Sequence, residues 1–544
     1  MRITKLFLPL TPEQKRAKKK ELLLGVISGV LLGISFPPIP LPVLIFFALI
    51  PYLYVIEKKE ELSSINRFTY FTIFIFSLIT LYWVGSWTKE ADPFLMISGV
   101  LLIFVNPALF IIPSTLYYFS KKAFNEKVAL FIFPFFWVSF EYAYSLTELR
   151  FPWLTLANSL SYFNWYIQIA DIIGAYGISL LIFYINIFLY LFIKNFSTEK
   201  KRSLRFAFIA FLLFLIPIVY GMYKTFSYTY SSKRIKVGLI QPNLNPWNKW
   251  EEGNLEEQLN LYLRLSQNAV NKGAKLIVWP ESALPVYLLS GNYPHEVERI
   301  HQFIDSNNVF LMTGMPDINF YFDLSKAPKD AKRTRSGDVA YTSYNSILLF
   351  SPFSSNVQKY GKMKLVPFGE KVPFVEYLPF LGDLIKWQVG ISSWNVGKEQ
   401  TIFNLLNSKI AGVVCFESIY SDFVANFVKK GAELLVVVTN DSWYGYSSGP
   451  FQHKEFAALR AIENRRTVIR AANGGISCII DPLGRTISET KLYTKDVLIG
   501  FAELRKEKTF FTQYPLIIPI FSSSISIINI MLFCFKKIIR NKTK

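Results

Sequence analysis

One cysteine follows directly on an apolar segment that has the composition of a buried strand. Residues 411–414 (Ala-Gly-Val-Val) lead to Cys415, and Glu417 comes two positions later. A thiol is a good nucleophile once it is deprotonated, and a nearby carboxylate can take up its proton and return it. The pattern suggests a nucleophilic cysteine, and a structural cysteine at a strand end is the alternative that spacing alone leaves open.

Two further reactive groups lie near the ends of apolar segments. Glu281 follows residues 277–280 (Ile-Val-Trp-Pro), and Lys362 precedes a loop stiffened by proline and glycine that contains Glu370. Strand ends of α/β domains meet at one edge, so these groups can converge on the thiol. A carboxylate would serve as base and then acid, and an ammonium would stabilise an oxyanion, which together describes acyl transfer through a thioester. Lys364 is an equally good amine by residue type, and each group also fits a solvated loop.

The other cysteines and the histidines suggest no metal chemistry. Cys478 lies in an apolar strand-like run, where a core position is expected, and Cys534 lies in the last apolar stretch. The chain has three histidines without a spacing typical of zinc, and His453 is expected to support a helix over 452–464. We therefore expect neither a metal nor a soluble cofactor.

The composition is that of a membrane protein. Hydrophobic residues make up 51% of the 544 residues and charged residues 18%. Crossing a bilayer takes about 20 apolar helical residues. Eight stretches approach this length and predict eight spans: 22–35, 42–56, 68–86, 94–119, 128–144, 164–193, 206–223 and 514–535. Gln168 and Asp171 fall inside one of them and should face the bundle interior or the interface.

The net charge of +20 is distributed as an orientation signal. With a cytoplasmic N-terminus, the cytoplasmic segments carry 23 Lys and Arg and the short connections on the other side carry 2. Positive residues favour the cytoplasmic side, so this topology is predicted and nucleic acid is not needed to explain the charge. The expected parts are a cytoplasmic segment 1–20, a transmembrane bundle 21–225, an extracytoplasmic domain 233–506, a last span 512–535 and a cytoplasmic basic tail 536–544.

The block 233–506 alternates short apolar runs with helical patterns, which favours a layered α/β domain. Runs ending at Gln241, Trp279, Phe350, Cys415 and Thr439 read as strands. The charged segment 325–338 is expected to be an exposed loop.

At this point the chain resembles a known superfamily. Trp279-Pro280-Glu281, Lys362 with the 365–370 loop, and Cys415-Phe416-Glu417 resemble the Glu–Lys–Cys triad of the nitrilase (carbon–nitrogen hydrolase) superfamily. With the membrane spans, the whole chain resembles the apolipoprotein N-acyltransferase family. Further matching segments are 241–243, 344–346, 439–445, 449–453 and 470–474, and in the membrane part 151–154 and 168–171.

The resemblance implies a multi-domain membrane protein with an eight-span α-helical bundle and an α-β-β-α sandwich. It implies that Cys415 is the nucleophile, Glu281 the base and then acid, and Lys362 the oxyanion stabiliser. Supporting and substrate-binding roles would fall to Glu370 and Glu417, and to Trp250, Asn345, Trp443 and Tyr444. Phe416 and Phe451 depart from the family, where Tyr and Trp are common, and this leaves lipid or acceptor preference in doubt.

The function implied is transfer of an acyl chain from a membrane phospholipid to the α-amino group of a diacylated apolipoprotein. The chain would be a monomer in a bacterial inner membrane, with its catalytic domain on the periplasmic side and no nucleic-acid partner. The alternatives are a membrane-tethered amidase of the nitrilase type and a non-catalytic lipoprotein-binding paralogue.

Overall fold

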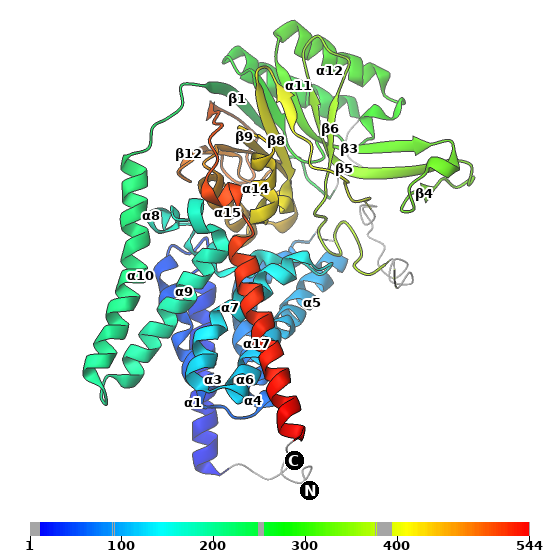
Figure 1. The fold of residues 1–544 in the computed structure, drawn as a ribbon. Coiled ribbons are helices and arrows are strands. Elements are labelled where there is room, and N and C mark those ends of the chain that lie inside the picture. Colours follow the sequence, from blue (N-terminus) through cyan, green and yellow to red (C-terminus); the bar gives the residue numbers. More distant parts are fainter. Residues whose placement is uncertain are drawn as a thin grey trace.

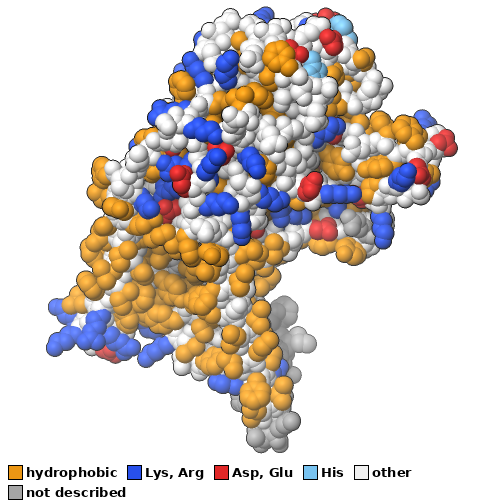
Figure 2. All heavy atoms as spheres, turned by 45° about the horizontal axis from the view of Figure 1, so that its top comes forward, with side chains coloured by type: hydrophobic (Ala, Val, Ile, Leu, Met, Phe, Trp, Pro, Cys, Tyr) orange, Lys and Arg blue, Asp and Glu red, His pale blue; other side chains and the backbone are white. Residues whose placement is uncertain are grey.

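The computed structural model describes residues 11–89, 91, 93–247, 255–375, 377 and 394–542, with side chains up to residue 539. It has two parts, a bundle of long helices and a domain with two β-sheets at one end of that bundle (Figure 1). Figure 2 shows apolar side chains covering the bundle, whereas charged side chains gather on the sheet domain and at the far end of the bundle. This distribution is that of a membrane helix bundle carrying a domain outside the lipid.

The bundle is built from helices of unequal length. They are α1 (Pro12–Ile34), α2 (Ile45–Ala48), α3 (Ile50–Lys58), α4 (Leu62–Leu81), α5 (Pro93–Leu109), α6 (Ile111–Ala123), α7 (Glu126–Leu146), α8 (Asn164–Ile167), α9 (Ala170–Asn195), α10 (Lys200–Phe226) and α17 (Ile517–Lys542).

The predicted count of eight spans is not confirmed. Among the described residues, six helical stretches are long and apolar enough to cross a membrane: Leu62–Gly85, Pro93–Ala123, Glu126–Leu146, Ala170–Asn195, Lys200–Phe226 and Ile517–Ile539. The first predicted span lies in α1, whose N-terminal half carries many Lys, Arg and Glu. The second is divided between a 3₁₀ turn and the short helices α2 and α3. Both lie below the length or the apolarity of a regular span.

Helix α1 nevertheless packs closely along α4. A Cβ atom added to Gly29 would lie 2.7 Å from Cβ of Ile75 and from the carbonyl oxygen of Thr72. A Cβ at Gly33 would lie 2.7 Å from Cβ of Ile79. Small residues at four-residue spacing let two membrane helices approach backbone to backbone. Glycines thus hold α1 within the bundle despite its polar beginning.

The domain beyond the bundle is a sandwich of two sheets. The strands of the first are β1 (Arg234–Gln241), β2 (Leu276–Trp279), β3 (Phe310–Tyr321), β4 (Lys332–Arg333), β5 (Ala340–Phe350), β6 (Gln358–Gly361) and β13 (Asp496–Glu503), in the order β13-β1-β2-β3-β5-β4 with β6 paired to β5. The second has β7 (Phe403–Leu405), β8 (Ser408–Val414), β9 (Leu434–Thr439), β10 (Val468–Ala472), β11 (Cys478–Ile480) and β12 (Thr486–Glu489), in the order β12-β11-β10-β9-β8-β7.

Helices cover the outer face of each sheet. Helices α11 (Leu255–Asn271) and α12 (Pro294–Asn307) pack on the first sheet, and α14 (Ser421–Lys429) and α15 (Ser448–Asn464) pack on the second. The predicted α-β-β-α sandwich is confirmed. Figure 1 shows α14 and α15 between the sheets and the membrane helices, so this layer faces the bundle.

The segment expected to be an exposed loop is partly a strand. Strands β3 and β5 run past the core as a long antiparallel pair in the register Tyr321↔Ala340, and β4 adds to their far end within 325–338. This outer part has few apolar residues, so apolarity did not mark it as strand. Strand β10 was missed for a similar reason, because the charged residue Arg470 interrupts its apolar pattern.

Buried polar contacts join the sandwich to the bundle. Arg465, at the end of α15, donates to Asp171 Oδ2 at 2.8 Å and to Gln168 Oε1 at 2.5 Å. Glu463 Oε1 accepts from the backbone N–H of Ala175 at 2.9 Å, next to a break in α9 at Gly174. Asp171 and Gln168 are buried against protein, as their polarity required.

Substitution of Gly29 tests the contact between α1 and α4. We expect Gly29→Val to lower the free energy of unfolding by about 2 kcal/mol, because overpacking a close contact costs ~1–3 kcal/mol. Thermal unfolding in detergent measures the change. The control is Leu23→Val, whose site on α1 is 58% exposed. Equal stability of the two variants would contradict the close packing.

Candidate active site

The three predicted reactive residues follow three strand ends of the sandwich. Glu281 lies two residues beyond β2, Lys362 directly after β6, and Cys415 directly after β8. Cys415 has φ of +49°, a left-handed conformation that is unfavourable for a residue with a Cβ. A strained backbone conformation persists only where many surrounding contacts stabilise it, and such positions cluster at functional sites.

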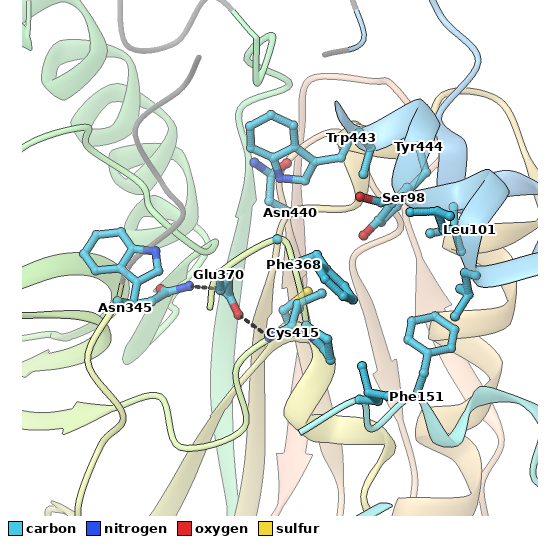
Figure 3. Close-up of a pocket in the computed structure, with 18 of the residues that line it drawn as sticks. Ser98, Leu101, Phe151, Asn345, Phe368, Glu370, Cys415, Asn440, Trp443 and Tyr444 are labelled. Carbon is cyan, nitrogen blue, oxygen red and sulfur yellow. Dashed lines mark hydrogen bonds between the residues drawn. The ribbon is translucent and has the colours of Figure 1, made fainter. Parts of the chain in front are cut away.

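Lys362 lies buried between two carboxylates. Its Nζ is 2.8 Å from Glu370 Oε1 and 3.4 Å from Glu281 Oε1, and 1% of its side chain is exposed. Asn345 donates its amide to both carboxylates, at 2.7 Å to Glu281 and 2.9 Å to Glu370. Figure 3 shows Asn345 and Glu370 on one side of Cys415. The family resemblance implied a substrate-binding role for Asn345, and here its amide group bridges the two acids.

Backbone donors fix the outer oxygen of each acid. Glu281 Oε2 accepts from the N–H of Asn440 at 3.0 Å, and Glu370 Oε2 accepts from the N–H of Val366 at 2.9 Å. Both carboxylates are therefore held from several sides, which sets their orientation before any substrate arrives.

Glu417 braces the loop that carries the lysine. Its Oε1 accepts from the hydroxyl of Tyr360 and the N–H of Met363, both at 2.7 Å, and from the N–H of Lys364 at 3.0 Å. Its Oε2 accepts from the N–H of Val414 at 2.9 Å. One buried carboxylate thus ties the residues after Lys362 to the strand that ends at Cys415.

Burial and charge shift the pKa values in this site. Burial, and then the charge of Glu281, raises the pKa of the Cys415 thiol above its ordinary value, against the opposing effect of Lys362. Burial disfavours the Lys362 ammonium, but Glu370 and Glu281 outweigh it and raise the pKa of Lys362. Both shifts favour a protonated thiol beside a charged ammonium in the resting site.

A second polar cluster supports Cys415 from behind. His453 Nε2 lies 3.1 Å from the carbonyl oxygen of Cys415 and 3.0 Å from Ser418 Oγ, and its Nδ1 lies 2.8 Å from Asp441 Oδ1. Arg470 donates to Asp441 Oδ2 at 2.5 Å. Sequence reasoning assigned His453 to helix support and missed its contact with the cysteine. The only available signal was its place in the 449–453 segment.

Potential metal ligands occur together in this cluster. Within the described parts of the chain, Cys415, Asp441 and His453 offer ligand atoms within 4.8 Å of one another. The guanidinium of Arg470 already lies against Asp441 and 2.9 Å from His453 Nδ1. The positive charge of Arg470 disfavours a metal cation at this place. Cys415, Asp441 and His453 therefore fit a hydrogen-bond network that supports the cysteine better than they fit a metal centre.

A cavity of about 270 Å³ connects the reactive residues with the membrane helices. Cys415, Lys362, Glu281 and Glu370 line one end, and apolar side chains of α5 line the other: Leu95, Leu101, Leu102, Val105 and Leu109. Figure 3 shows Leu101, Phe151 and Tyr444 on the side of Cys415 opposite Asn345. Trp443 also lines the cavity. Trp443 packs edge-on against Trp247, and Tyr444 against Trp83 of the bundle. Trp250 lies outside the described residues.

Comparisons with known proteins agree with this architecture. The carbon-nitrogen hydrolase family matches residues 236–506, and the apolipoprotein N-acyltransferase N-terminal domain matches residues 28–188. An apolipoprotein N-acyltransferase of Chlorobaculum tepidum is 34% identical over 519 residues, which cover 93% of this chain and 95% of that protein. One of Geobacter metallireducens is 32% identical, over 92% of this chain and 93% of that protein.

The chain belongs to the apolipoprotein N-acyltransferase family. This confirms the resemblance seen in the sequence. The two departures from the family can now be placed. Phe416 is buried between Phe151 and Tyr420, with ring centroids at 5.7 and 5.4 Å. Phe451 lines a separate groove with Phe36 and Tyr446 near the outer ends of α1 and α4. Phe416 therefore touches the reactive region, and Phe451 does not line the cavity of Cys415.

The charges around the thiol predict opposite effects of two substitutions in this family member. Glu281→Gln removes a charge that raises the pKa of Cys415, so alkylation should become severalfold faster at a fixed pH and its profile should move to lower pH. Lys362→Met removes the opposing charge and should move the profile to higher pH. Iodoacetamide labelling of the Cys415 peptide, followed by mass spectrometry against pH, measures both. Identical profiles would contradict the electrostatic account.

Glu417→Gln tests the brace between the lysine loop and β8. An amide cannot accept from all four donors, and a buried donor left without a partner costs about 1–3 kcal/mol. We expect the free energy of unfolding to fall by about 2 kcal/mol. Denaturation in detergent measures it, with Glu399→Gln at an exposed site as the control. A change no larger than that of the control would show that the contacts are dispensable.

Proposed function

We propose that this protein transfers an acyl chain from a glycerophospholipid, through a thioester at Cys415, to the α-amino group of a diacylated apolipoprotein. The observation that carries the proposal is the single cavity that joins a buried thiol, carboxylate and ammonium to an apolar wall of α5. An apolar wall that continues into the bundle fits an acyl chain, and the polar end fits the ester that the chain carries. The names of the relatives support the acceptor.

In the first half-reaction Glu281 takes the proton of Cys415, and the sulfur attacks the carbonyl carbon of the ester. The carbonyl oxygen becomes an oxyanion that Lys362 stabilises. When the intermediate collapses, the C–O bond to glycerol breaks and Glu281 returns the proton to the leaving oxygen. A lysophospholipid departs and an acyl thioester remains.

In the second half-reaction the neutral amine of the apolipoprotein attacks the thioester carbon. Glu281 takes a proton from the amine, the C–S bond breaks, and the thiolate recovers a proton from Glu281. Asn345 supports this step, because its buried Oδ1 has no hydrogen-bond partner among the described residues and can accept from the incoming amine. No redox partner is needed in either step, since the donor is already an ester.

We propose further that the protein is a monomer of the bacterial inner membrane, with its sandwich domain on the periplasmic side and no nucleic-acid partner. Segments 1–20 and 536–544 would be cytoplasmic, with membrane parts at 21–225 and 512–535 and the catalytic domain at 233–506. The charge bias of 23 to 2 Lys and Arg supports this orientation. The α9–α10 connection and the C-terminus lie at the end of the bundle away from the sandwich (Figure 1).

Mass spectrometry of the Cys415 peptide tests the proposal. Purified protein incubated with labelled phospholipid alone should gain one acyl mass on that peptide. Adding a diacylated lipopeptide with a free α-amine should remove it and yield an N-acylated lipopeptide.

Matched variants and acceptors complete this experiment. Cys415→Ala should abolish the label, and Cys478→Ala, in the core of β11, should retain it. An N-acetylated lipopeptide should leave the thioester in place. Release of free fatty acid instead of transfer would show that water is the acceptor, as in a hydrolase of the nitrilase type, and folded protein that never gains the acyl mass would contradict the proposal.

A further inference from the structure

The loop after α7 carries an arginine between two residues that line the cavity. Leu149 and Phe151 line the cavity, and Arg150 lies between them in the sequence. The Nε atom of Arg150 is buried and has no hydrogen-bond partner among the described residues. A buried charged donor without a partner carries a desolvation cost that an anionic ligand would remove.

A second cation lies nearby. The Nζ of Lys364 is 5.4 Å from the ring centroid of Tyr420 and 5.8 Å from that of Phe423. No ion pair of Lys364 within 4.0 Å is found in the described part of the chain. Its backbone N–H is held by Glu417 at 3.0 Å, so its position is set by the brace of the active site.

Tyr420 links the two cations. It is 3% exposed, and its hydroxyl is buried without a partner among the residues described. Its ring packs edge-on against Phe416, which stacks on Phe151, the residue after Arg150. This row of rings runs from Phe151, the residue after Arg150, to Tyr420, whose ring lies 5.4 Å from the Nζ of Lys364.

The electrostatics agree with that proximity. Burial, and then the charge of Arg150, lowers the pKa of Lys364. Among the acids, Asp422 has the largest effect on the pKa of Lys364. Burial raises the pKa of Asp422 itself, and the charge of Lys364 opposes that rise. Glu417 also acts on the pKa of Lys364 in the same direction as Asp422. Among the described residues, no ion pair within 4.0 Å joins either acid to the side chain of Lys364 or Arg150, so both cationic groups can still accept a negatively charged ligand.

We propose that Arg150, Lys364 and Tyr420 form a subsite for the phosphate diester of the acyl-donating phospholipid. This inference rests on the proposed function. A guanidinium, an ammonium and a hydroxyl are the donors that phosphate oxygens accept from. Arg150 follows α7 by four residues, and in the proposed orientation this end of the helix faces the outer membrane surface. In a phospholipid the reactive ester lies only a few bonds from the phosphate. A phosphate subsite separated from Cys415 by the rings of Phe151, Phe416 and Tyr420 is therefore close enough to serve the same lipid molecule.

Such a subsite gives the two lipids different anchors. The donor carries a phosphate, whereas the diacylglyceryl group of the proposed acceptor carries none. The subsite would hold the donor while Cys415 is acylated, and the acceptor would bind without using it. The phosphate contact is thus a specificity determinant for the first half-reaction alone.

The test compares two donors with the same acyl chains, phosphatidylglycerol and diacylglycerol, in neutral detergent micelles. The rate of acyl gain on the Cys415 peptide is measured for each. Wild type should prefer the phosphate-bearing donor by about tenfold or more, the effect expected for charged hydrogen bonds. In the double variant Arg150→Gln/Lys364→Gln the preference should fall to roughly twofold or less. The fall should come from a slower reaction with phosphatidylglycerol, while the reaction with diacylglycerol keeps its rate. Arg150→Lys should keep part of the preference.

Lys506→Gln is the control, because Lys506 is exposed and lies four residues before the membrane-proximal helix α16 (Phe510–Gln513). It should keep the full preference. Iodoacetamide labelling of Cys415 at the wild-type rate shows that a variant is folded, and if the double variant is not, Arg150→Lys carries the test.

Three outcomes would overturn the subsite: variants that keep the wild-type preference, a wild type without preference, or an effect equal to that of Lys506→Gln. Inhibition of wild type but not of the double variant by inorganic phosphate would assign the site to free phosphate instead. A wild type that gains no acyl mass from either donor, under conditions where Cys415 is alkylated, would refute the proposed function itself.

Discussion

The candidate active site depends on one buried positive charge. Lys362 can keep its ammonium out of water only because Glu370 and Glu281 flank it at 2.8 and 3.4 Å. Those two acids come from different segments of the chain, and Asn345 from a third strand fixes both. The ends of β2 and β6 and the middle of β5 must therefore meet at one point, and the sandwich is the arrangement that makes them meet.

Much of this sandwich could be predicted, because its central strands are apolar runs with a polar residue directly after them. Strands β2 and β9 end at the residues that the sequence predicted, Trp279 and Thr439. The strands that escaped prediction break that pattern. β10 carries Arg470, whose charge is neutralised by Asp441 from a distant loop. The outer β3–β5 pair is held by backbone pairing rather than by apolar burial.

The candidate site was predicted unevenly for a similar reason. Glu281, Lys362 and Cys415 were found through local patterns and a family resemblance, and the structure brings all three to one cavity. Three other contacts depend on residues far apart in the sequence and could not be predicted from local patterns. They are the hydrogen bonds of Asn345 to two acids, the contact of His453 with the Cys415 carbonyl, and the hydrogen bonds of Arg465 to the helix bundle. The predicted count of eight spans was not confirmed for a related reason, since close packing at glycines, which apolarity does not reveal, joins α1 to α4.

The wall that α5 contributes to the cavity has a consequence for how the protein meets its substrates. A cavity continuous with a membrane helix is filled from within the lipid layer, so its occupancy follows the mole fraction of each lipid in that leaflet. Adding water around the membrane leaves the occupancy of the cavity by a given lipid unchanged, whereas adding other lipids to the leaflet lowers it. The relevant kinetics are therefore those of encounters in two dimensions, and membrane composition itself becomes a variable of the reaction.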